Sequence, residues 1–192
     1  HRVMILEVMG RDAGHIAINS GIAGGADVIL VPEVPYTLEG VSRKIRTVLA
    51  QGRTHALVVV AEGVKTETGE RAVISYSGGQ QRYGGIGHYL TEKIAEMTGA
   101  ETRVTILGHV QRGGNPSTRD RLIASAFGVH AVDLVARKEF GTMVGWRDRG
   151  VCELPLSEVT IGPRCLDPDG TMVNTARKLG IYVGEKGARR QD

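Results

Sequence analysis

Four short apolar runs constrain what this chain can fold into more than any other feature. They cover residues 3–8, 28–31, 56–61 and 104–107, are rich in Val and Ile, and do not alternate with polar residues. Runs of this kind are typical of strands that are buried on both faces. Longer stretches separate them, so the chain is expected to alternate strands with helices.

Helical spacing fills most of the gaps between these runs. Apolar residues recur three or four positions apart in residues 38–49 and 86–97, and Gly52 and Gly99 follow these stretches as stop signals. Residues 16–22 predict a shorter helix. Residues 122–135 are apolar on more than one face, which predicts a buried helix. The alternation indicates an α/β fold, with an open, mostly parallel sheet flanked by helices.

Two segments depart from this rhythm. Residues 64–85 carry five glycines among polar residues. They predict a long loop or a small hairpin, and a loop of that length is usually functional or mobile. The charged stretch 185–192 is predicted to be a disordered tail.

Charge, hydropathy and cysteine content argue against several function classes. A net charge of +3 without a block of like charges does not favour a nucleic-acid partner. The longest apolar run falls far short of the ~18 residues of a membrane span. Cys152 and Cys165 fit no zinc spacing and are predicted to be free thiols of a reducing compartment. We therefore expect a cytoplasmic protein with no nucleic-acid partner, no membrane segment and no metal site in this segment.

Candidate ligand-binding side chains follow three of the four runs, where a parallel sheet binds its ligands. They are Arg11, Glu62, and the pair His109 and Arg112. Arginine forks match phosphate oxygens, and a carboxylate accepts hydrogen bonds from sugar hydroxyls. Each residue alone is better explained as a solvated strand end. All four at one predicted edge favour a site for a phosphorylated sugar.

Three segments carry a resemblance to a known family. Residues 103–114 read Arg-Val-Thr-Ile-Leu-Gly-His-Val-Gln-Arg-Gly-Gly, and Asp120-Arg121 follow after five residues. Residues 7–11 read Glu-Val-Met-Gly-Arg, with Gly14 and Ile-Ala-Gly-Gly at 22–25 behind them, and residues 31–33 read Val-Pro-Glu. Together they resemble the 6-phosphofructokinases of bacterial type, over residues 2–144, and specifically their C-terminal, substrate-binding portion. The resemblance implies phosphoryl transfer to the 1-hydroxyl of fructose 6-phosphate, a step of glycolysis.

The resemblance also implies a role for each matching residue. Arg11 would stabilise charge on the transferring phosphoryl group, as cationic clamps do in this chemistry. The sugar and its phosphate would be held by Met9, Gly10, Glu62, His109 and Arg112, joined by Arg2 and Arg103 from a neighbouring subunit. The active site would therefore be shared between subunits of a homo-oligomer, which in the family is a tetramer.

The family's donor-binding Gly-Gly-Asp motif and its Thr-Ile-Asp-Asn-Asp catalytic segment do not occur in the sequence. The chain also opens at His1 directly into an apolar run. We therefore expect a fragment that is inactive alone. ATP (or pyrophosphate) and Mg²⁺ would be bound mainly by the missing half, which would also supply the catalytic base.

These implications give a domain division. Residues 1–110 are expected to form the fructose 6-phosphate-binding domain, to which residues 162–184 return. Residues 111–161 would belong to the phosphoryl-donor domain whose remainder is missing, so that part of their apolar surface would be exposed. Asp27 and Arg53 match a candidate effector site, but Gln51 stands where the family has an Arg, which leaves effector control open.

Two alternatives remain. A pyrophosphate-dependent phosphofructokinase would share the same sugar site, and the choice of donor depends on residues in the missing half. A non-catalytic sugar-phosphate-binding or regulatory module is an alternative of another class. Such modules usually lose active-site residues, whereas this chain keeps Arg11, Glu62, His109 and Arg112.

Overall fold

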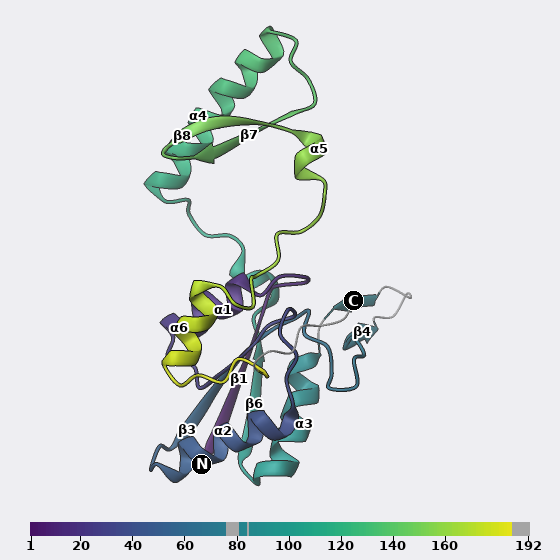
Figure 1. Cartoon of the computed structure of the whole chain (residues 1–192), viewed down its shortest axis with the longest axis vertical. Helices are drawn as coiled ribbons and strands as arrows, with labels where there is room; N and C mark the ends of the chain where they lie inside the picture. Colours follow the sequence, from purple (N-terminus) through teal and green to yellow (C-terminus); the bar gives the residue numbers. More distant parts are fainter. Residues whose placement is uncertain (76–80, 84, 186–192) are drawn as a thin grey trace. The chain divides into compact units, whose positions relative to one another are not determined.

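The computed structural model describes residues 1–75, 81–83 and 85–185 (Figure 1). The chain forms two compact units. The first comprises His1–Gln111 together with the returning segment Arg164–Asp192, and the second comprises Arg112–Pro163. Each unit is described by itself below.

The first unit is built on a four-stranded sheet. Its strands are β1 (Arg2–Val8), β2 (Val28–Leu30), β3 (His55–Ala61) and β6 (Glu101–Ile106), in the order β2-β3-β1-β6. All three pairings are parallel, and the carboxyl ends of β1, β3 and β6 lie level, because Val8 pairs with Ala61 and Glu7 with Ile106. The predicted open parallel sheet is confirmed.

Helices cover both faces of this sheet. They are α1 (His15–Ala23), α2 (Leu38–Ala50), α3 (Ile86–Thr98) and α6 (Thr171–Lys178). Gly21 of α1 lies against Ile29, whereas Gly87 of α3 lies against Val104. The strand register places Ile29 and Val104 on opposite faces, so α1 and α3 cover different sides. Figure 1 shows α6 beside α1, and α2 near α3.

Local signals explain where the longer helices begin and end. The Thr37 hydroxyl accepts a hydrogen bond from Gly40 N at 3.0 Å and caps α2. Gly99 ends α3 in the left-handed conformation, with φ of 66°, as the stop signal predicted. Several apolar residues of these helices are fully buried, among them Ile45 and Ile94.

The prediction that all four strands are buried on both faces is wrong for β6. This strand lies at the edge of the sheet, and its residues Glu101, Arg103 and Thr105 are exposed. Val104, on the opposite face, contacts α3. An edge strand has one neighbour, so burial depends on which of its faces a helix covers, and the run of apolar residues does not report that.

The segment 64–85 forms a hairpin in its described part. Strands β4 (Val73–Ser75) and β5 (Gln81–Tyr83) pair antiparallel, and Lys65 bridges Arg71. Residues 76–80 and 84, on which part of the prediction falls, lie outside the described residues.

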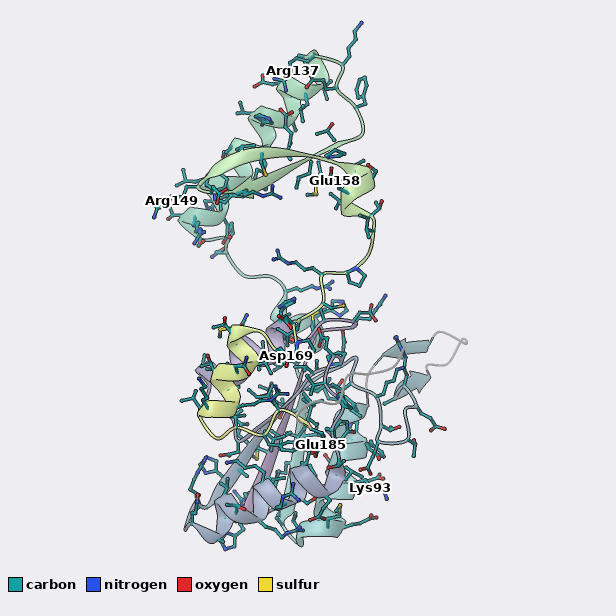
Figure 2. All side chains as sticks on the ribbon, in the orientation of Figure 1. Lys93, Arg137, Arg149, Glu158, Asp169 and Glu185 are labelled. Carbon is teal, nitrogen blue, oxygen red and sulfur yellow. The ribbon has the colours of Figure 1, made fainter. Side chains whose placement is uncertain are left out.

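The prediction of a disordered tail over 185–192 is wrong for its first residue, Glu185. Glu185 N donates to Pro35 O at 2.8 Å, and its carboxylate accepts from Thr37 and Tyr182. These two hydroxyls lower the pKa of Glu185. Glu185, labelled in Figure 2, is therefore part of the first unit, and the remainder of the predicted tail, 186–192, lies outside the described residues.

The second unit contains α4 (Thr118–Ala136), the antiparallel pair β7 (Thr142–Arg147) and β8 (Gly150–Pro155), and the short α5 (Leu156–Val159). Ser117 and Asp120 form a capping box at the start of α4. Phe127 of α4 meets Trp146 of β7, with ring centroids 6.4 Å apart. Near the end of α4, Arg137 (labelled in Figure 2) donates to Glu153 of β8 at 2.8 Å.

The helix predicted over 122–135 exists, but its predicted burial is wrong. Leu134 is buried, whereas Leu122, Val129, Val132 and Val135 are at least 60% exposed. A two-stranded hairpin covers one flank of a helix, so an all-round apolar helix in this unit must expose the others.

None of the helices in the part of the chain that the structure describes is long and apolar enough to cross a membrane. Cys152 and Cys165 form no disulfide with each other.

Candidate functional site

The carboxyl ends of β1, β3 and β6 bring three loops together. Glu62 N donates to Val8 O at 2.9 Å, and Leu107 N donates to Glu7 O at 3.1 Å. These bonds pair β1 with the first residue that follows β3 and the first residue that follows β6. The loop that follows β1 is therefore flanked by the starts of the other two.

The loop after β1, residues 9–14, is held at its start by two side chains. Met9 N donates to Gln111 Oε1 at 2.6 Å, and Gly10 N donates to Glu62 Oε1 at 3.2 Å. Gly63 N returns a bond to Gly10 O at 3.0 Å. Gly10 has a φ of 146°, a conformation that residues with a side chain rarely adopt. The backbone of Met9, Gly10 and Arg11 is thus fixed between the other two strand ends.

Besides Met9 and Gly10, three of the predicted site residues lie at this edge. Arg11 follows β1, Glu62 follows β3, and His109 lies in the 3-10 turn η1 (Gly108–Gln111) after β6. Arg11 and His109 are exposed, and Glu62 is half-buried. An exposed guanidinium and imidazole beside a carboxylate suit a ligand that carries both anionic oxygens and hydroxyls.

Glu33 holds the other end of the same loop. Its two carboxylate oxygens accept from Gly14 N at 3.0 and 3.1 Å, and Oε1 also accepts from Leu166 N at 2.8 Å. Gly14 is the N-cap of α1, where a carboxylate is favoured by the helix dipole. One carboxylate therefore joins the loop, the start of α1 and the returning segment.

Glu7 is a buried carboxylate beneath the site. It is 2% exposed, and its Oε2 accepts from Gly87 N at 2.9 Å, in the first turn of α3. Burial raises the pKa of the Glu7 carboxyl above its usual range, against the lowering effect of the amide bonds that it accepts. Glu7 thereby supplies an acceptor to α3, whose N-cap is a glycine.

Comparison with known proteins bears on this arrangement. The sequence pattern of the family described as "Phosphofructokinase" matches residues 1–135. The chain belongs to the phosphofructokinase family. It is 54% identical, over 96% of its length, to ATP-dependent 6-phosphofructokinase 1 of Synechocystis sp., of which it covers 51%. The chain thus spans about half the length of the curated relatives that it matches.

Solved structures of phosphofructokinases share the fold. The pyrophosphate-dependent phosphofructokinase of Marinobacter aquaeolei aligns with 98% of this chain and 51% of its own, at 25% identity and a TM-score of 0.69. The phosphofructokinase of Saccharomyces cerevisiae aligns with 82% of this chain and 20% of its own, at 30% identity and a TM-score of 0.65.

Two predicted phosphate ligands lie elsewhere on this phosphofructokinase chain. Arg2 begins β1, about 20 Å of extended strand from Val8, and Arg103 lies within β6. Both pair with Glu101, Arg2 at 3.2 Å and the Arg103 Nε at 2.8 Å, and these arginines lower the pKa of that carboxyl. The two guanidinium groups therefore form one exposed cluster, away from Arg11 and Glu62.

Arg112 is exposed and is the first residue of the second unit. The first segment of the first unit thus ends at Gln111, and the predicted contact of Arg112 with the sugar phosphate stays a prediction.

The candidate effector residues Asp27 and Arg53 form an ion pair at the amino edge of the sheet. Arg53 donates to Asp27 Oδ1 at 2.5 Å, and Leu57 N donates to Oδ2 at 2.9 Å. Asp27 is 5% exposed. The sequence paired these two residues by family position alone, and the structure places them in direct contact.

Three residues that position the site were quoted in the sequence motifs without a role: Gln111, Glu33 and Glu7. The signal that could have found them was their position in the sequence, since each lies at or after the carboxyl end of a strand of the same parallel sheet. Which backbone amide each one accepts from depends on strand order, which the motifs do not contain.

Proposed function

We propose that this chain is the fructose 6-phosphate-binding part of an ATP-dependent 6-phosphofructokinase. The enzyme would transfer the γ-phosphoryl group of ATP to the 1-hydroxyl of fructose 6-phosphate, giving fructose 1,6-bisphosphate and ADP. The observation that carries this proposal is the meeting of Arg11, Glu62 and His109 at three adjacent strand ends of a phosphofructokinase fold.

The chemistry of these side chains supports specific roles. Glu62, whose Oε1 already holds Gly10 N, has a second oxygen that suits a sugar hydroxyl. His109 and Arg112 suit the 6-phosphate, and Met9 and Gly10 line the sugar. Arg11 suits the transferring phosphoryl group, where a fixed cation stabilises the developing charge.

ATP is favoured as donor because a relative with 54% identity is named ATP-dependent, whereas the pyrophosphate-dependent structure is 25% identical. Within the described residues no group of three His, Cys, Asp or Glu side chains could hold a metal ion. We propose that Mg²⁺ and the donor phosphates are bound by residues outside this chain. We also propose that the protein is cytoplasmic.

We further propose that the enzyme is a homo-oligomer, a tetramer as in the family, whose sites are shared between subunits. The position of Arg2 and Arg103 supports this. Arg2 in β1 and Arg103 in β6 lie on an exposed strand face with Glu101 and Thr105, and both guanidinium groups pair with Glu101 at the start of β6, not with the residues at the carboxyl ends of the strands. A second subunit docked on this face would receive both guanidinium groups.

The test is steady-state turnover of the protein at the full length of its relatives, with fructose 6-phosphate and either ATP or pyrophosphate. Turnover with ATP that is lost in Arg11→Ala supports the proposal. Turnover with pyrophosphate and not with ATP would mean that pyrophosphate is the phosphoryl donor. Sugar-phosphate binding without turnover on either donor would favour a regulatory module.

Subunit sharing has its own test, in which the inactive variants Arg11→Ala and Arg103→Ala are mixed and reassembled. An isologous interface between the two variants creates one intact site per hybrid pair, so about a quarter of the parent activity should return. No recovery in a reassembled mixture would refute shared sites.

A further inference from the structure

The contact between Gln111 and Met9 joins residues 102 positions apart at the centre of the site. Both residues are half-buried. The donor is a backbone N–H, so the acceptor must be the side-chain carbonyl of Gln111, and this fixes the orientation of its amide. At 2.6 Å, this bond is the shorter of the two that hold the start of the loop, since Gly10 N lies 3.2 Å from Glu62.

Met9 N has no partner in the sheet ladder. The pairing of β1 with β3 ends at Val8, and with β6 at Glu7. A half-buried N–H beyond the last ladder pair needs another acceptor, because leaving it unpaired is costly. Gln111 supplies that acceptor from η1, the turn that also carries His109.

We propose that Gln111 is a positioning residue for phosphoryl transfer. Its side-chain carbonyl ties the loop that carries Arg11 to the turn that carries His109, and so fixes the separation of the two groups. This inference rests on the proposed function, because it takes Arg11 to act on the transferring group and His109 to hold the sugar phosphate.

The loop depends on such a tie because Gly10 follows Met9. A glycine samples more backbone conformations than other residues do, so without the Gln111 bond the stretch before Arg11 would be held at Gly10 alone, through its bonds with Glu62 and Gly63. A displaced Arg11 weakens a contact made chiefly in the transition state, which lowers kcat and leaves KM little changed. Loss of a sugar contact would instead raise KM.

The kinetic experiment compares Gln111→Met with the parent at the full length of the relatives. Met keeps the length of the side chain and removes the strong acceptor. We expect kcat to fall about 10- to 100-fold, as for a misplacement of about 1 Å, with KM for fructose 6-phosphate within about threefold. The control is Val110→Met, which places the same side chain at the neighbouring position, 86% exposed, and should leave kcat unchanged.

Amide hydrogen exchange on the 192-residue chain tests the bond without turnover. Met9 N–H should exchange faster in Gln111→Met and stay protected in Gln111→Glu, whose carboxylate also accepts. The amides of Glu62 and Leu107, bonded to Val8 O and Glu7 O, report that the three strand ends remain folded.

The outcomes separate the two levels of the argument. Two results would overturn the positioning role alone. One is an active parent whose kcat is unchanged in Gln111→Met. The other is a Met9 amide that exchanges as fast in Gln111→Glu as in Gln111→Met. A parent that turns over neither donor would refute the proposed function, and the positioning role would fall with it.

Discussion

Gly63 is the tightest point of the site, and substituting it tests the packing of the loops directly. A Cβ at this position would stand 1.7 Å from Arg11 O, 2.5 Å from Arg11 C and 2.8 Å from Gly10 O. All three atoms are backbone, so no side chain can rotate away. To restore an ordinary contact of 3.4 Å, the Arg11 carbonyl would have to move by about 1.7 Å.

The cost of Gly63→Ala follows from two contributions. Overpacking against backbone costs about 1–3 kcal/mol, and losing the bond from Gly63 N to Gly10 O costs about 1 kcal/mol more. We therefore expect the first unit to lose about 2–4 kcal/mol of unfolding free energy.

Two spectroscopic signals separate the units in a urea titration. Trp146 is the single tryptophan and lies in β7 of the second unit, so its fluorescence reports that unit. Far-UV circular dichroism is dominated by the larger first unit. Gly63→Ala should lower the midpoint of the circular dichroism transition and leave the Trp146 transition in place.

Gly128→Ala is the matched control for Gly63→Ala. Gly128 lies in α4, and a Cβ there would meet nothing within 4 Å. Because Ala favours a helix over Gly, this variant should stabilise the second unit by about 0.5–1 kcal/mol. If Gly63→Ala left the circular dichroism midpoint unchanged, the close approach of the β1 and β3 loops would be refuted.

Three further predictions concern charge and surface. Burial raises the pKa of Glu7. The stability of the parent relative to Glu7→Gln should therefore be greatest below the unfolded pKa of about 4.3 and should fall as the pH rises through the folded pKa. Urea midpoints from pH 4 to 8 that show no such fall would contradict this. Arg53→Met leaves the buried Asp27 carboxylate without its cation. Since Arg53 is 43% exposed, the free energy of unfolding in urea should fall by about 1–2 kcal/mol. A fall within error would show that water replaces the cation. The exposed apolar face of α4 should make the chain self-associate in light scattering. Val132→Glu, at a 67% exposed position, should reduce that association, and a parent that is a monodisperse monomer would count against it.

Much of the first unit could be predicted from the pattern of apolar residues along the sequence alone. Runs of Val and Ile predicted β1, β2 and β3, and apolar spacing predicted α2 and α3 with glycine stops, because these signals are local. The fold class followed from their alternation. The family followed from identities at fixed spacing in residues 103–121, which needed no knowledge of the fold.

Burial at the margins of each unit could not be predicted in this way. The runs in β6 and α4 are apolar enough for a core, yet β6 lies at an edge and α4 is covered on one flank. An apolar pattern reports what a segment can bury, and its neighbours decide how much is buried.

The sequence by itself therefore determined the strands of the four-stranded sheet, helices α1 to α4, the α/β class, the family and the residue types of the site, whereas β7, β8, α5 and α6 were not predicted. Only the tertiary structure decided which groups meet: Gln111 with Met9, Glu33 with both Gly14 and Leu166, and Arg2 with Glu101. The physical reason is that a hydrogen bond between groups far apart in the chain exists only in one strand order and register. That order is a property of the whole sheet, and no segment of the sequence contains it.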